Sequence, residues 1–138
     1  MMRTLRRVAV GTALVVLLGA AAAAWYVHGP VPVPDGYRFP RHTMWGGGPA
    51  GLFEGTLTEA DGCVRTDDGF TVAWPPGYRL DVEDGELVVW GSGRTARMGE
   101  PVRMGGGWYE TEPLPDLLSS ARDSGCPMPF FLSTGWAD

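Results

Sequence analysis

The sequence predicts a mainly β protein: a small barrel of the OB or SH3-like kind with one short helix, preceded by an N-terminal transmembrane helix. Three observations support this prediction. An uncharged run of 20 residues lies near the N-terminus, the 138 residues include 21 Gly and 12 Pro, and short apolar runs alternate with turn signals after residue 50. Such a turn-rich chain favours short strands over long helices, with a two-sheet β-sandwich as the alternative to a barrel.

The N-terminal segment has the pattern of an export signal. Residues 8–27 carry no charge, and as a helix they would extend about 30 Å, the thickness of a hydrocarbon core. Arg3, Arg6 and Arg7 precede them, so residues 1–7 are expected to form a cytoplasmic basic tail with the rest of the chain outside. The run is either a retained signal anchor, giving a single-pass protein of the cell membrane, or a signal peptide cleaved near Ala20–Ala24, giving a secreted protein.

Residues 28–49 are predicted to be a linker. They contain five prolines, at positions 30, 32, 34, 40 and 49, and the run Gly46–Gly48. Alternating prolines favour an extended polyproline II conformation, which acts as a semi-rigid spacer. The extracytoplasmic β domain is then expected at residues 50–138.

The first part of this domain contains three expected strands, at 52–58, 63–66 and 70–74. Asp61-Gly62 and Asp67-Asp68-Gly69 separate them as turns. After the third strand, Pro75-Pro76-Gly77 suits a type II turn with Gly77 at the position of positive φ.

The clearest local signal is a hairpin over residues 78–91, centred on Asp84-Gly85, a dipeptide typical of a type I′ turn. A slip of one residue would turn its acidic side chains toward the core, so the register is well specified. The expected pairs are Val82 with Leu87 and Leu80 with Val89 on an apolar side, and Arg79 with Trp90 (a cation–π pair) and Glu83 with Glu86 on the other.

Short strands are expected at 94–98 and 102–104, followed by Gly105–Gly107 as a turn or bulge. Residues 114–122 form the expected helix, since Leu114, Leu117, Leu118 and Ala121 recur at helical spacing. A last strand is expected at 130–133.

Cys63 and Cys126 are the only cysteines, and both follow the export segment. Disulfides persist outside the cytoplasm, and closing a loop of 63 positions would stabilise a small domain by about 4 kcal/mol. A redox-active pair is the alternative, but the C-x-x-C spacing typical of such pairs is missing. A structural disulfide is therefore predicted.

Several motifs in this order resemble a family of small, uncharacterised bacterial envelope proteins, many of them lipoprotein-like. The shared motifs are G-T-L with G-C-V-R (55–65), W-P-P-G (74–77), V-E-D-G-E-L-V-V (82–89), R-M-G-G-G (103–107) and C-P (126–127). They specify turns and cysteines, so the resemblance implies a fold and no catalytic residue. The chain departs from a lipoprotein at Ala20, where lipidation would require Cys.

Composition and motifs disfavour several function classes. The three N-terminal arginines contribute +3 to a formal net charge of −5, so the remainder carries −8, which repels nucleic acid. His28 and His42, the only histidines, fall in the predicted linker, which leaves no nucleophile–histidine pair and no zinc set in the domain. The sequence therefore predicts no catalytic residue, no metal and no cofactor.

Aromatic residues are the remaining functional signal. Trp108 and Tyr109 follow the triple glycine and are the candidate binding residues, as an exposed platform for a sugar ring or a protein partner. We expect a non-enzymatic module that binds a protein of the cell envelope, with a module that binds cell-wall glycan as the alternative.

Overall fold

The computed structural model describes the backbone of residues 2–44, 48–112 and 114–138, and within these ranges the side chains from residue 14 onward. The chain divides into two compact units, one ending at Pro30 and the other spanning Val31–Asp138. The second unit is mainly β, with a closed five-stranded barrel and short helices.

Helix α1 (Met2–His28) forms the first unit, and its large apolar side chains from Leu14 to Leu18 are exposed. Within the described residues, no helix is both long enough and apolar enough to cross a membrane. The transmembrane helix expected at 8–27 is therefore not supported, and the side chains of positions 8–13 lie outside the described part.

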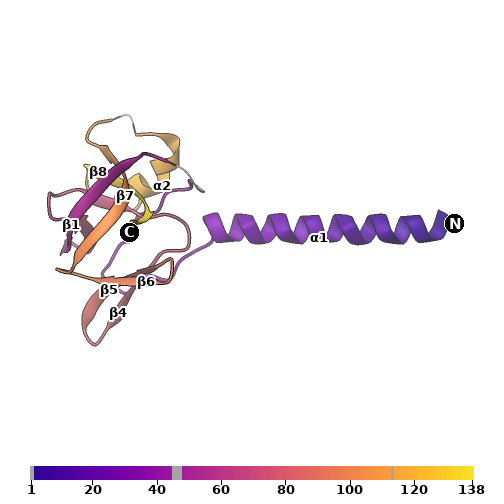
Figure 1. Cartoon of the computed structure of the whole chain (residues 1–138), viewed down its shortest axis with the longest axis horizontal. Coiled ribbons are helices and arrows are strands. Elements are labelled where there is room, and N and C mark those ends of the chain that lie inside the picture. The colour runs from indigo at the N-terminus through magenta and orange to yellow at the C-terminus, as the bar shows by residue number, and fades with distance from the viewer. Residues whose placement is uncertain (1, 45–47, 113) are drawn as a thin grey trace. The chain divides into compact units, whose positions relative to one another are not determined.

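Five strands close the barrel: β1 (Gly51–Ala60), β2 (Cys63–Thr66), β3 (Thr71–Ala73), β8 (Phe130–Trp136) and β7 (Pro101–Tyr109), in that spatial order. Figure 1 labels β1, β7 and β8, with β7 beside both of the others. Every neighbouring pair is antiparallel except β3 and β8. Alternate residues point inward and fill the interior with apolar side chains, Leu57, Val72 and Phe131 among them. This closure excludes the sandwich alternative.

A separate three-stranded sheet is inserted between β3 and β7. It contains β4 (Arg79–Glu83), β5 (Glu86–Gly91) and β6 (Arg94–Arg97), with β5 in the centre (Figure 1). The β4–β5 register is the predicted one at every pair. Asp84 and Gly85 have φ angles of 52° and 80°, the positive values that a type I′ turn requires.

The side chains of this hairpin follow the prediction with one exception. Arg79 lies 4.9 Å from the centre of the Trp90 ring, which confirms the cation–π pair. Val82 is 42% exposed, because it lies at the tip, beyond the reach of the core that covers its neighbours. The predicted apolar side is therefore buried only over its inner part.

The glycine run at 105–107 does not form a turn. It lies inside β7, with a bulge between Gly105 and Gly106. A Cβ on Gly106 would overlap the Leu132 carbonyl and the Phe131 ring, so glycine lets β7 and β8 approach closely enough to close the barrel.

A second core cluster lies beside the barrel around the expected helix. The segment forms a 3-10 turn (Asp116–Leu118) followed by α2 (Ser119–Asp123). Leu114, Leu118 and Ala121 are buried there, together with Cys63 and Cys126. These cysteines form a disulfide with Cα atoms 6.0 Å apart, which confirms the predicted bond.

Part of the predicted linker belongs to the barrel unit. Residues Arg38 and Arg41 form isolated parallel bridges with Cys63 and Trp74, and Phe39 stacks on the Trp74 ring at 5.6 Å. The spacer expected at 28–49 is therefore wrong for residues 37–44, because apolar and hydrogen-bonding side chains between the prolines dock on the barrel. Residues 45–47, which include most of the Gly46–Gly48 run, lie outside the described residues.

Candidate functional site

The two predicted binding residues do not form one platform. Trp108 is 41% exposed, and its ring meets Phe131 edge-on at 5.1 Å. Tyr109 is the next residue of β7, so its side chain points to the opposite face, where it packs against the disulfide cluster. A planar ligand cannot stack on both rings at once.

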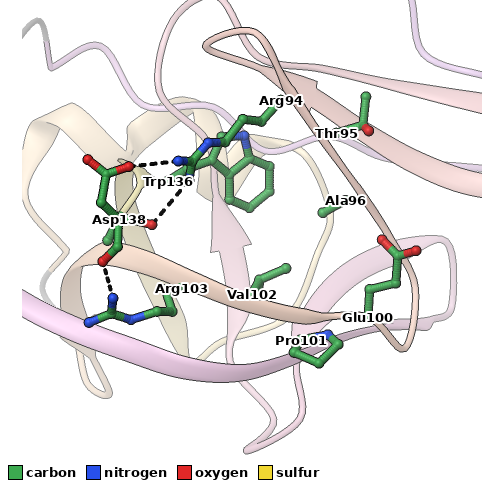
Figure 2. A pocket seen from close by; sticks show the side chains of 10 residues that line it. Arg94, Thr95, Ala96, Glu100, Pro101, Val102, Arg103, Trp136 and Asp138 are labelled. Atoms are coloured by element: carbon green, nitrogen blue, oxygen red, sulfur yellow. Dashed lines mark hydrogen bonds and ion pairs between the residues drawn. The ribbon is translucent and has the colours of Figure 1, made fainter.

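A cleft of about 440 Å³ lies elsewhere, between β6 and β7 (Figure 2). Its walls include Arg94, Thr95 and Ala96 of β6, Val102 and Arg103 of β7, and Trp136 at the end of β8. We call it the Trp136 cleft. Concave sites that combine an apolar surface with a few polar groups are the usual form of ligand sites in proteins.

Hydrogen bonds and ring packing hold Trp136 in place. Its indole Nε1–H donates to the Gly91 carbonyl at 2.9 Å, and its backbone N–H donates to the Tyr78 hydroxyl at 3.1 Å. The ring also meets the fully buried Trp74 edge-on at 5.6 Å. This packing fixes the half-buried indole in place, so its contact surface is formed before any ligand arrives.

The two arginines of the cleft are held by exposed acceptors. Arg94 Nη2 lies 2.7 Å from the Asp138 carboxylate, and Arg103 donates to the Asp138 main-chain oxygen and pairs with Glu54 at 2.7 Å. Exposed ion pairs of this kind contribute at most about 1 kcal/mol each. An incoming acceptor could therefore replace the Asp138 contacts at low cost.

β6 also presents a strand edge. No strand of the described chain pairs with its outer side, since the sheet order is β4-β5-β6. The Met98 N–H donates to the Leu87 carbonyl, so these two residues form a hydrogen-bonded pair. In an antiparallel ladder every second pair is hydrogen-bonded, so the next such pair is Ala96 with Val89 of β5. The N–H and C=O of Thr95, one residue earlier, consequently point outward.

Glu100 bonds to the next outward-pointing N–H on the edge of β6, that of Arg97. Its carboxylate accepts a hydrogen bond of 3.1 Å from the Arg97 N–H, which also points outward by the same alternation. Thr95 is thus the β6 residue whose outward backbone groups lie along the cleft.

His42 is a buried residue that the sequence placed in the linker. It is 1% exposed; its Nδ1 accepts from the Met44 N–H at 3.1 Å, and its Nε2 lies 2.6 Å from the Ser133 carbonyl. Because Nδ1 is an acceptor, the proton sits on Nε2 and the ring is neutral. Burial lowers its pKa; the Ser133 hydrogen bond opposes this, and the Arg41 charge adds to it.

The chemistry available at these positions suits recognition. Guanidinium groups and a backbone amide donate hydrogen bonds to acceptors, and an indole ring packs against apolar surfaces. Among the described residues, no group of three or more His, Cys, Asp or Glu side chains is arranged to hold a metal ion.

Sequence reasoning missed the Trp136 cleft for an identifiable reason. The last strand was expected to end at residue 133, but β8 continues to Trp136 and carries the indole onto the barrel wall. Arg94 and Arg103 lie nine residues apart and meet only because β6 and β7 fold beside each other. No local spacing could have singled them out.

Comparison of the chain with protein-family models, with curated proteins and with solved structures finds no match.

Proposed function

We propose that this protein is an exported, non-enzymatic binding module of the bacterial cell envelope that recognises a protein partner through the Trp136 cleft. The observation that carries the proposal is the free edge of β6 beside a preformed aromatic wall. A strand edge offers main-chain hydrogen bonds to an extended partner, and an anchored tryptophan is typical of protein interfaces.

Export is supported by the N-terminal pattern of three arginines followed by 20 uncharged residues, acting either as an anchor or as a cleaved signal. The Cys63–Cys126 disulfide supports the same location, since such bonds persist in oxidising compartments. If the chain is exported, a phosphatase that works only outside the cytoplasm should be active when it is fused after residue 138. An inactive fusion with normal expression would contradict export.

The barrel is best assigned to the OB kind, because its strand order has a single parallel pair joining the third and last strands. Barrels of this kind often bind ligands on their second and third strands. Here the residues of β2 and β3 are almost all buried, beneath residues 37–44 and the second core cluster. Recognition is therefore proposed at the inserted sheet, and the acidic net charge argues against nucleic acid as the ligand.

Photocrosslinking in intact cells tests the proposal. A photoreactive residue replaces Thr95 at the cleft, and a matched control replaces Thr58, which is exposed on β1. We expect a defined protein adduct from position 95, absent at position 58 and lost when Arg94→Gln is added. Equal labelling from both positions would contradict a partner at the cleft.

A glycan of the cell wall is the second candidate, favoured by the indole of Trp136 beside charged hydrogen-bonding groups. Retention of the protein on purified cell wall should fall at least tenfold in Trp136→Leu. Trp108→Leu is the matched control, because that exposed indole lies outside the cleft. Equal retention of both variants and the parent protein would exclude this candidate.

A further inference from the structure

We propose that the Trp136 cleft binds an extended peptide segment with an acidic side chain, which adds to β6 as a fourth strand and replaces Asp138 on Arg94 and Arg103. This inference rests on the proposed function and names the chemistry of the partner. It combines three features of one surface: the outward backbone groups of Thr95, the Trp136 wall and a pair of arginines.

The backbone of Thr95 sets how the peptide is held. Its outward N–H and C=O can exchange two hydrogen bonds with one residue of an added strand, as in other cases of strand addition. Arg97 N–H is already bonded to Glu100, so the added strand is anchored at Thr95 and extends toward Arg94.

The side chains of the cleft set which peptide fits. Arg94 and Ala96 are two residues apart on β6, so they belong to the same face of the sheet. On the added strand, side chains on the same face would likewise be two residues apart, a distance of about 6.7 Å. A peptide with an acidic residue two positions from an apolar residue therefore reaches the arginines and Trp136 together.

The contacts of Asp138 support the choice of a carboxylate. Its side-chain carboxylate bonds to Arg94 at 2.7 Å, and its main-chain oxygen accepts from Arg103 (Figure 2). A carboxylate of this chain thus already pairs with Arg94, one of the two arginines that we assign to the partner. Guanidinium groups pair with carboxylates through two parallel hydrogen bonds, which adds selectivity over a neutral amide.

Asp138 is then an internal competitor. A group tethered beside its site acts at an effective concentration in the millimolar range, and it must be displaced before the peptide binds. Removing its negative charge should raise the affinity for the peptide, whereas removing either arginine should lower it.

Selection of displayed random octapeptides on the full-length protein tests the inference, followed by fluorescence anisotropy with the enriched peptides. We expect enriched sequences with Asp or Glu two positions from an apolar residue. Replacing that acidic residue by its amide should weaken binding at least tenfold, and Asp138→Asn should strengthen it about threefold.

Thr95→Pro removes the outward N–H while leaving the ladder to β5 intact, since proline is tolerated at such edge positions. Binding should fall at least tenfold in Thr95→Pro and in Arg94→Gln with Arg103→Gln, fall far less in Thr95→Ala, which keeps the outward N–H, and stay unchanged in Arg122→Gln. Circular dichroism and thermal unfolding report whether each variant is folded.

Two results would overturn the inference: enriched peptides without acidic residues, or equal binding to Thr95→Pro and Thr95→Ala when both are folded. If a partner still crosslinks at position 95 in either case, the proposed function stands and only the assigned peptide chemistry fails.

Discussion

The barrel and the inserted sheet differ in how their strands end. Each barrel strand has a neighbour on both sides, and residues 37–44 and a disulfide brace the barrel from outside. In the three-stranded sheet, no strand among the described residues pairs with the outer edge of β4 or of β6. A closed sheet has no edge to offer a partner, whereas an open one does. We infer that the barrel carries the stability and the inserted sheet carries the recognition.

The largest effect should come from removing the disulfide that braces the barrel. The double variant Cys63→Ser with Cys126→Ser should lose about 4 kcal/mol of unfolding free energy, given the separation of 63 residues. Urea denaturation with and without reductant measures this. Under conditions where the variant is folded, peptide affinity should be unchanged; a matching loss of affinity would break the division between stability and recognition.

Gly91→Ala should disturb the place where the two regions meet. A Cβ on Gly91 would overlap the Tyr78 ring, which in turn supports Trp136. Overpacking of this kind costs about 2 kcal/mol, and it should also weaken peptide binding because the indole moves. Thermal unfolding and anisotropy measure the two effects, with Arg122→Gln as the control. A loss of stability with full binding would show that the indole does not need this support.

Acid should weaken the docking of residues 37–44 through His42. Its folded pKa lies below the ordinary value of 6.5, so between these two values the unfolded chain binds more protons. The stabilising contribution of this residue is complete above pH 6.5 and is lost as the pH falls through the folded pKa, by at most about 1.4 kcal/mol per pH unit.

The control for this pH dependence is His42→Gln, which cannot titrate in that range. Its unfolding free energy should be lower than that of the parent protein at pH 7.5 and should fall less steeply between pH 6.5 and 5. Parallel curves for the two proteins would assign the acid sensitivity to other groups.

The smallest effect should come from the hairpin tip. Gly85 has a φ of 80°, and a Cβ there would meet no atom within 4 Å, so Gly85→Ala tests the backbone alone. A left-handed alanine costs about 1 kcal/mol, and Gly85→Asn should cost less because asparagine tolerates this conformation. If chemical denaturation gives Gly85→Asn a lower unfolding free energy than Gly85→Ala, this explanation is wrong.

Local signals explain what could be predicted from the sequence. Asp84-Gly85 and the alternation around it determine the β4–β5 register without help from the rest of the chain. The pairing of Cys63 with Cys126 followed because no other cysteine competes for either. Both features rest on neighbouring residues or on a single choice of partner.

Long-range contacts explain what could not. His42 is held by Ser133, 91 residues away, so nothing near it in the sequence distinguishes a docked segment from a proline-rich linker. Trp108 and Trp136 are both tryptophans near the end of a barrel strand. Only the fold places arginines and a strand edge beside one of them and apolar side chains beside the other.

The disulfide has a further consequence for the covalent topology of the chain. Cys63 and Cys126 close a ring that contains the whole inserted sheet, including the exposed tip at Asp84-Gly85. A protease that cuts at this tip opens the ring without releasing a fragment. The nicked protein stays one molecule until it is reduced, so a cut in the inserted sheet would pass unnoticed on a non-reducing gel and give two pieces on a reducing one.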